Sequence, residues 1–560
     1  MKRFKKLVIS LLIVIGFVLF TNNSFGQKPS YPIDTKVVST VERMVVPVQV
    51  PSTAEKIFPY ELSKYAQNGY GKWQFGNGLS YQKRMDLMPE SYSGSSVKKI
   101  AKLLNFFAIT DIHLTDKESP AQAIYLGYKG NVISAYSGIM LSTTQVLDAT
   151  IQTANALHKQ NPFDFGISLG DNCNSSQYNE LRWFIDVLDG KKINPDSGKK
   201  DDPIAGPLND YQDEYQAAGL DKNIPWYQAI GNHDHNWMGV YPPNDYLKKS
   251  YIGDSIIKVG KNIFTSAGIN ERTIYVGVFD GNTIYGDVVG IGPVSSTKPV
   301  LIAADKNRRS LSSVEWTNEF FNTSSKPIGH GFNKTDAAKG FACYAFEPKA
   351  DLPLKVIVLD DTQKDSDPST DIHGHSFLDS ERYNWLVKEL DKGQAEGKLM
   401  IIAAHVPVGI SDPDPEMGMA PNSATTEANL IAKLNTYPNL ILWVAGHRHL
   451  NTVTALKSPD PAHPELGFWE VETSSLREFP QQFRTFEIVR NSDNTISVFA
   501  TDIDPAVKEG SLAATSRMYA IGAYEIFGVA KADSYNAELV KLLTPEMQVK
   551  IQSYGKPIGQ

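Results

Sequence analysis

Five short motifs bring together carboxylate, imidazole and amide side chains. In chain order they are Asp111-Ile112-His113, Gly170-Asp171-Asn172, Gly231-Asn232-His233-Asp234-His235, the single His405, and Gly446-His447-Arg448-His449. These donor types suit divalent Mn, Fe or Zn. In Asp-x-His and His-x-His, alternate residues of an extended segment face the same side, and a preceding glycine permits a tight turn. The donor set therefore predicts a metal centre.

Taken singly, most of these motifs also have a structural explanation. Asp111-Ile112-His113 is a common tripeptide, Gly170-Asp171-Asn172 is an ordinary turn, and a histidine such as His405 often ends a buried strand. The Gly-His-Arg-His motif is more specific, and Gly-Asn-His-Asp is the most specific of the five. It is their combination in this order that indicates a functional site.

Each motif follows an apolar run that has the length of a β-strand. The runs are 106–110, 163–169, 226–230, 399–404 and 440–445. Segments 146–157 and 378–390 have helical spacing instead, and strands alternating with helices are typical of a layered α/β domain. In open α/β sheets, ligands bind at the carboxyl ends of strands, so we expect the five motifs to converge there.

The ordered set Asp-x-His, Gly-Asp, Gly-Asn-His-Asp, His and Gly-His-x-His resembles the calcineurin-like metallophosphoesterases over roughly residues 100–480. The resemblance implies a two-sheet βαβ sandwich flanked by helices. Asp-x-His with Gly-His-x-His also resembles the class III cyclic nucleotide phosphodiesterases. Segment 304–332, with Arg308, Arg309, Trp316 and His330, is similar to a bacterial exported subgroup of the superfamily.

The resemblance also implies roles for individual residues and a cofactor of two divalent transition-metal ions. Asp111, His113 and His449 would hold one ion, Asn232, His405 and His447 the other, and Asp171 would bridge both. His233 would lie beside the ions as the catalytic histidine, and Asp234 would orient it. Purple acid phosphatases place a tyrosine ligand three residues after the bridging aspartate. Because Asn174 stands there, we expect no purple iron centre.

These assignments predict a hydrolase of phosphodiesters or phosphomonoesters. A metal pair supplies hydroxide at neutral pH and offsets phosphate charge. The alternative is a catalytically inactive metal- or phosphate-binding protein on the same scaffold. All seven ligand positions and His233 are filled, which favours the enzyme. Hydrolysis of a pyrophosphate or of a phospholipid headgroup would change the substrate but not the site.

Three further groups of residues could serve the site or the fold. Arg448 lies between two predicted ligands and would contact either phosphate or the sheet. Arg308 and Arg309 would line a lid or form a surface pair. His373 and His375 follow an apolar run that ends at two aspartates, and we expect them to have a loop role.

The chain divides into four predicted parts. Residues 1–26 have the basic start, apolar run and small polar end of a signal peptide. The run, 7–20, is shorter than the roughly 20 residues of a spanning helix, so we expect export to the periplasm or the exterior and no stable membrane span. We expect an N-terminal extension over 27–100, a metallophosphoesterase domain over 101–502 with a lid insertion at 236–340, and a helical tail over 503–560.

Charge and cysteine content narrow the partners. The formal charge is −7, and loss of the four basic residues in 1–26 would take it to −11. A net-negative surface argues against nucleic acid as the main partner, whereas bound metal can attract a small phosphorylated substrate. Only Cys173 and Cys343 occur, too few for a disulfide scaffold. Cys173 is expected to be a small buried thiol.

Overall fold

The computed structural model describes most of the chain. It covers residues 30–128, 136–261, 266–366, 374–410, 418–528 and 533–558. The predicted signal peptide, 1–26, and His373 lie outside these residues. Within them, no helix is both long enough and apolar enough to cross a bilayer.

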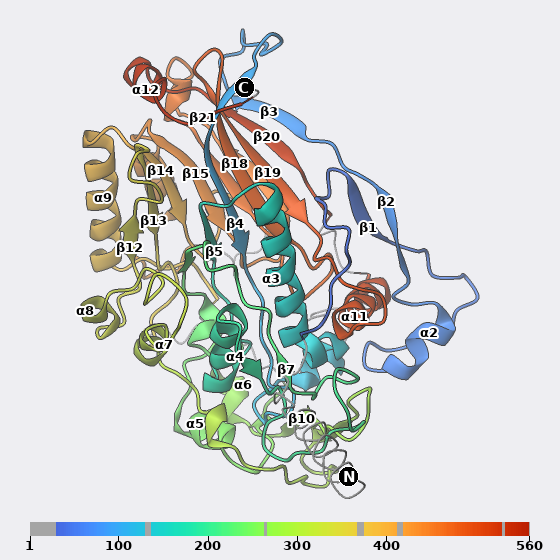
Figure 1. Ribbon diagram of the computed structural model, residues 1–560. Coiled ribbons are helices and arrows are strands. Elements are labelled where there is room, and N and C mark those ends of the chain that lie inside the picture. The colour runs from blue at the N-terminus through green and yellow to red at the C-terminus, as the bar shows by residue number, and fades with distance from the viewer. Residues whose placement is uncertain are drawn as a thin grey trace, which may run out of the picture.

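Two β-sheets form the centre of the protein (Figure 1). The six-stranded sheet has the order β12 (Tyr344–Phe346), β13 (Leu354–Val358), β14 (Leu399–Ala403), β15 (Leu440–Ala445), β17 (Phe468–Glu472) and β16 (Thr452–Leu456). The eight-stranded sheet has the order β3 (Gln82–Leu87), β20 (Ala537–Lys541), β19 (Ile496–Ile503), β18 (Phe483–Asn491), β4 (Lys99–Ile109), β5 (Phe165–Ser168) and β8 (Trp226–Gln228), with β21 (Lys556–Pro557) paired to β4.

The strands that precede the motifs run parallel within each sheet. In the six-stranded sheet β13, β14, β15 and β17 are parallel. In the eight-stranded sheet β4, β5 and β8 are parallel. Parallel strands end at the same edge, so each sheet delivers its polar motifs to one place.

Aromatic side chains fill the space between the two sheets. Phe106 stacks on Phe165 and Phe486 of its own sheet, with ring centroids 4.7 and 4.8 Å apart. Phe346 of the opposite sheet meets Phe165 edge-on at 5.4 Å. Burying each such side chain contributes about 1.5–3 kcal/mol, so this core holds the two sheets in a fixed relation.

Helices cover the outer face of each sheet. α9 (Ser380–Ala395) and α10 (Glu427–Leu434) pack on the six-stranded sheet, where Leu386 and Leu430 share a core with Trp443. α3 (Thr143–Gln160) and α4 (Tyr178–Leu188) pack on the eight-stranded sheet (Figure 1). The predicted α/β class, a two-sheet sandwich flanked by helices, is confirmed.

The predicted insertion and the predicted N-terminal extension carry small sheets of their own. Residues 236–340 contain β9 (Lys258–Val259), β10 (Ile274–Phe279) and β11 (Val288–Pro293) in one sheet, with α5 (Asp245–Tyr251), α6 (Ser266–Asn270), α7 (Ser313–Glu319) and α8 (Lys334–Ala337). The extension pairs β1 (Arg43–Pro47) with β2 (Trp73–Asn77) and holds α2 (Tyr65–Asn68). β6 (Lys192–Ile193) pairs with β7 (Tyr215–Gln216).

The tail is not only helical. Besides α11 (Leu512–Phe527) and α12 (Pro545–Ile551), it contains β20 and β21. β20 lies between β3 and β19, because Ala537 and Leu539 fill the core of the eight-stranded sheet. The expectation of a helical tail is corrected accordingly, since the five residues of β20, which include Glu538 and Lys541, are too few and too polar to give a clear period.

Candidate metal centre

The seven predicted ligands follow five strands, within four residues of each strand end. Asp111 and His113 follow β4, Asp171 follows β5, Asn232 follows β8, His405 follows β14, and His447 and His449 follow β15. The structure therefore brings all seven to one place at the edges of both sheets. Asp111 and His405 are completely buried, and His449 is partly exposed.

One cluster joins three of these side chains. The Nε2 atom of His449 lies 3.3 Å from Oδ1 of Asp111 and 3.1 Å from Nε2 of His113. The Nε2 atom of His113 lies 3.8 Å from the same Asp111 oxygen. One carboxylate oxygen and two imidazole nitrogens thus surround a common point.

A second cluster adjoins the first through Asp171. The Nε2 atom of His405 lies 3.3 Å from Oδ2 of Asp171, 2.9 Å from Oδ1 of Asn232 and 3.3 Å from Nδ1 of His447. The same Asp171 oxygen is 3.7 Å from Nε2 of His113. Asp171 therefore stands between the two clusters, the position required of a bridging ligand.

The chemistry of these atoms fits bound cations. Oδ1 of Asp111 is buried and accepts no hydrogen bond from the described residues. Two pairs of imidazole nitrogens face each other at 3.1 and 3.3 Å, and only one nitrogen of each pair can donate a hydrogen. A divalent transition metal satisfies a carboxylate oxygen and several imidazole lone pairs at once.

The ligand-bearing loops have an unusual backbone conformation. Asp111, His113, Asp171, His447 and His449 have positive φ angles of 50°, 45°, 54°, 78° and 61°. Residues other than glycine rarely adopt this region, which costs roughly 1–3 kcal/mol per residue and is concentrated at functional sites. The surrounding fold must hold these loops against that cost.

The glycines before the ligands permit close backbone approach, as the sequence predicted. A Cβ atom on Gly231 would lie 2.3 Å from the backbone nitrogen of Asp171. A Cβ atom on Gly446 would lie 2.1 Å from Oγ1 of Thr110 and 2.4 Å from Oδ2 of Asp111. Any larger residue at either position would push a predicted ligand out of place.

A second layer of groups orients the imidazoles, and the sequence did not reveal it. Glu478 bonds Nδ1 of His449, and the carbonyl oxygen of Leu169 accepts from Nδ1 of His405 at 2.9 Å. Asp361 accepts the backbone N–H of His405 at 3.2 Å. Partners of the ring nitrogens fix the ring orientation of metal-binding histidines, whereas Asp361 holds the backbone at His405. Only Asp361, at the end of a strand on the same edge, carried a sequence signal.

Charge is distributed unevenly across the two clusters. Burial opposes ionisation of Asp111 and Asp171, but His449 and His405 outweigh it and hold the pKa of each carboxyl below its usual value. Burial likewise disfavours charge on His405, yet Asp171 raises the pKa of His405 to about 10. The pKa of His449 is raised well above its usual value by Asp111 and Glu478, against burial.

The other two imidazole ligands behave in the opposite way. Burial lowers the pKa of His113, and burial together with His405 lowers the pKa of His447 to about 3. Both rings are therefore neutral at pH 7, with a lone pair available for a metal.

His233 lies beside the clusters with one ring nitrogen fixed. Its Nδ1 atom is 2.7 Å from the carbonyl oxygen of Asn174, which can only accept, so Nδ1 carries the hydrogen. Its backbone N–H donates to Oδ1 of Asp171 at 2.8 Å, and its ring lies 4.5 Å from that of His113. Burial lowers the pKa of His233 to about 3.

The role expected of Asp234 is corrected. Its carboxylate accepts four backbone N–H groups, those of Gly231, Asp171, Asn172 and Cys173, at 2.9, 2.9, 2.9 and 3.1 Å. It thus holds the turn that carries Asp171, and the orienting contact to the His233 ring comes from Asn174. Burial and the charge of Asp171 raise the pKa of Asp234 to about 7.

Asn174 continues into a buried polar network behind His233. Its side-chain oxygen accepts from Arg477, and its amide donates to Gln122, whose own amide donates to Glu180 at 2.8 Å. All four partners are at most 2% exposed. Nothing in the sequence linked these residues, which lie up to about 350 positions apart.

Of the residues whose roles the sequence left open, those that the structure describes do not lie among the ligands. Arg448 pairs with Glu472 at 2.6 Å, so it faces the sheet. Arg308 is buried in an ion pair with Asp116 at 3.1 Å, and is therefore neither a lid residue nor a surface residue. Arg309 packs over the ring of Tyr178, and the buried His375 bonds the carbonyl of Gly418.

Both cysteines are free and buried. The expectation that Cys173 is a small buried thiol is confirmed.

Comparison with known proteins gives distant structural likenesses. No protein-family model and no curated protein matches the sequence. A dimetal phosphatase from Danio rerio is similar in structure, with 11% identity, 72% of this chain and 98% of that chain covered, and a TM-score of 0.37. The Plasmodium inner-membrane-complex anchor GAP50 also shows 11% identity, 73% and 86% coverage, and a TM-score of 0.31.

A third similar structure is the sulfate thiohydrolase SoxB of Thermus thermophilus. It shows 11% identity, covers 75% of this chain and 60% of that chain, and gives a TM-score of 0.27. Scores of this size carry no argument about activity, which has to come from the residues of this chain.

Proposed function

We propose that this protein is an exported phosphoesterase that hydrolyses a phosphoric ester of a small molecule with two divalent transition-metal ions, Mn, Fe or Zn. The observation that supports it is the convergence of seven donor side chains into two adjoining clusters that share Asp171. Asp111, His113 and His449 would hold one ion, and Asn232, His405 and His447 the other. Two such ions, when bound, lower the pKa of a water molecule and offset the charge of a phosphoryl group.

His233 would serve the departing ester oxygen. Its Nδ1–H is committed to Asn174, which leaves Nε2 as the nitrogen that can exchange a proton. With a pKa of about 3, the ring is neutral at pH 7 in the metal-free protein. A phosphate anion close to Nε2 would raise that pKa by electrostatic attraction, so His233 would be charged only when substrate is in place.

Turnover of nitrophenyl esters tests the proposal. The purified protein, loaded with Mn, Fe or Zn, should hydrolyse nitrophenyl phosphate or bis-nitrophenyl phosphate, and chelation should abolish the activity. Asp111→Asn is the matched inactive control. Elemental analysis should find about two ions per chain. Two bound ions without turnover of any mono- or diester would instead indicate a metal-binding protein on this scaffold.

Export rests on the order of basic, apolar and small residues in 1–26. N-terminal sequencing of protein from its native host should find a start near Gln27, and an intact Met1 would contradict it.

A further inference from the structure

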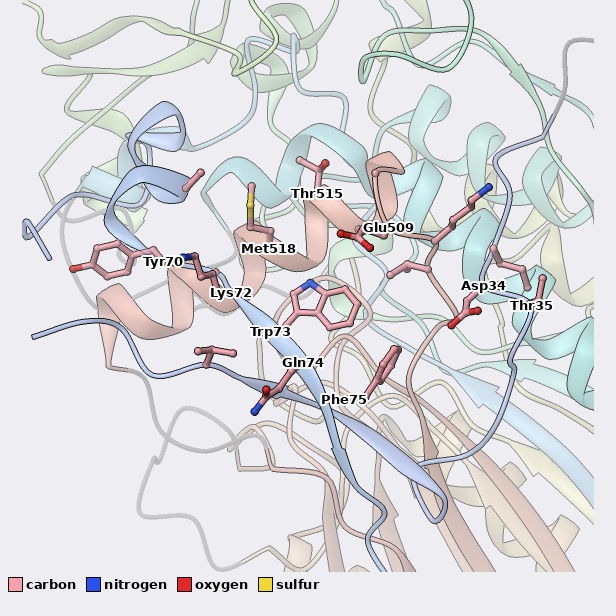
Figure 2. A pocket seen from close by; sticks show the side chains of 18 residues that line it. Asp34, Thr35, Tyr70, Lys72, Trp73, Gln74, Phe75, Glu509, Thr515 and Met518 are labelled. Carbon is pink, nitrogen blue, oxygen red and sulfur yellow. The ribbon is translucent and has the colours of Figure 1, made fainter.

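A wide groove lies between the N-terminal extension and α11, and none of its lining residues is a predicted metal ligand (Figure 2). Strand β2 forms one wall, and α11 with the loop before it forms the other. Residues 33–35 close one end. Its volume of about 970 Å³ is at the upper end of the range for sites that hold small organic ligands.

Two aromatic rings on β2 are fixed in place as they line this groove. Trp73 and Phe75 meet edge to face with centroids 5.4 Å apart. Arg517 lies 5.1 Å from the Trp73 ring centroid, and Arg43 lies 3.7 Å from that of Phe75. Each guanidinium holds its ring by a cation–π contact, so the rings are rigid platforms. Phe75 remains 44% exposed.

Polar groups line the groove together with the rings (Figure 2). They include a carboxylate and hydroxyls, on Glu509, Thr35 and Thr515, whereas the side chain of Gln74 points to the opposite side of β2 from Trp73. The formal charges of the residues that line the groove sum to zero, since Asp34 and Glu509 are acidic and Lys72 and Lys508 are basic. Asp34 is also paired with Arg43 at 2.9 Å. The lining therefore offers a ligand no dominant charge of either sign.

We propose that this groove binds a neutral oligosaccharide. One face of a sugar ring presents C–H groups, which pack against the electron-rich face of an aromatic ring. The hydroxyls at the edge of the sugar exchange hydrogen bonds with carboxylate and hydroxyl groups. A purely apolar ligand would desolvate the polar rim without compensation, and a highly charged ligand would meet charges of its own sign as well as opposite ones. This site goes beyond the proposed function and does not depend on it.

Titration with neutral hexasaccharides tests the proposal. The full-length protein is titrated with hexamers of glucose, mannose, galactose and N-acetylglucosamine, and the heat of binding is measured. At least one should bind saturably, with a Kd of roughly 10 µM to 1 mM. Trp73→Ala should raise that Kd about tenfold, as loss of an aromatic contact implies. Phe58→Ala, an exposed aromatic of the same extension outside the groove, should leave it unchanged.

Two further variants keep the test decisive should Trp73→Ala fold poorly. Thr515→Trp would fill the groove from α11 and block binding, and Glu509→Gln would weaken it several-fold. Binding of no hexasaccharide at 10 mM, roughly ten times the weakest Kd expected, would overturn the proposal, as would binding that Thr515→Trp leaves intact. Binding of only charged oligosaccharides or phosphatidylcholine vesicles would also overturn it. Asp171→Asn should still bind sugar, so failure of the proposed phosphoesterase activity is distinguishable.

Discussion

The two halves of the metal centre carry opposite charges. The eight-stranded sheet supplies Asp111 and Asp171, whose pKa values are lowered, whereas the six-stranded sheet supplies only imidazoles. In the metal-free protein His449 and His405 have raised pKa values and pair with those carboxylates, each at 3.3 Å. The difference leads us to expect that protons and metal ions, if bound as proposed, would compete to hold the two halves together.

The two halves also differ in how their side chains are fixed. Backbone N–H groups bound by Asp234 hold the turn of Asp171 on the eight-stranded side. On the six-stranded side, the carboxylates of Asp361 and Glu478 bond His405 and His449. We therefore expect metal affinity to fall most on the eight-stranded side when the shared ligand Asp171 is lost. On the six-stranded side, we expect it to fall most when Asp361 or Glu478 is lost.

The largest expected effect comes from Asp171→Asn, because one oxygen of Asp171 lies near both His113 of the first cluster and His405 of the second. The variant should lose both metal ions and roughly 10³-fold or more in kcat/KM, equivalent to several kcal/mol of stabilisation. Asn232→Ala, which touches only the second cluster, should weaken mainly one ion. Elemental analysis measures how many ions each variant retains. Full occupancy in Asp171→Asn would refute the bridging assignment. The loaded protein should show no intense visible band, since Asn174 replaces the tyrosine ligand.

The next effect separates catalysis from metal binding. His233→Ala should keep both ions and lose roughly 10²–10⁴-fold in kcat, the usual contribution of a general acid. The loss should be smallest for nitrophenyl esters, whose leaving group is stable without a proton, and largest for alkyl esters. His375→Ala, a buried histidine bonded to Gly418, is the matched control. Equal losses for both ester types at full metal content would exclude proton donation by His233.

A smaller effect is expected from a change on the six-stranded side alone. Glu478→Gln removes the carboxylate that bonds Nδ1 of His449, and the affinity for one ion should fall roughly 10- to 100-fold. The other ion should bind as before. Glu465 and His463 form a comparable pair at the surface, so Glu465→Gln is the control that should change nothing. Metal titrations of both variants, monitored by calorimetry, would measure the affinity for each ion. An equal loss of affinity at the two sites would contradict the assignment of two separate clusters.

The smallest effect is on stability against pH. His405 has a pKa of about 10 in the folded metal-free protein and 6.5 ordinarily. Its contribution to stability is therefore fully present below about pH 6.5 and is lost as pH rises through 10. The chelated protein should lose roughly a few °C in Tm across that interval. The metal-loaded protein should lose less, because metal replaces the proton. Scanning calorimetry of both forms checks the difference.

The order of strands and motifs could be predicted because both depend on short stretches of sequence. The apolar runs 163–169 and 440–445 gave β5 and β15, and the polar residues directly after them could be assigned to a shared edge. The tight turns at Gly231 and Gly446 could be predicted for the same reason, because each glycine directly precedes a predicted ligand. A Cβ atom at either position would lie too close to Asp171 or Asp111.

Contacts between distant segments could not be predicted. Arg308 pairs with Asp116 and Glu478 bonds His449 only because the loops between them fold back. Asp234 was expected to act on its neighbour in the sequence, but four backbone N–H groups compete for its oxygens and hold it elsewhere. Period and spacing contain no information on such competition.

The edge of the eight-stranded sheet links the beginning and the end of the chain. β3 of the N-terminal extension pairs in parallel with β20, about 450 residues later. During synthesis β3 cannot form this pair until β20 has been made. Closing so distant a pair is slow, and the sheet edge would then form among the last steps of folding. A chain that cannot complete this sheet edge until β20 has been made stays unfolded there for longer, which is compatible with the proposed export.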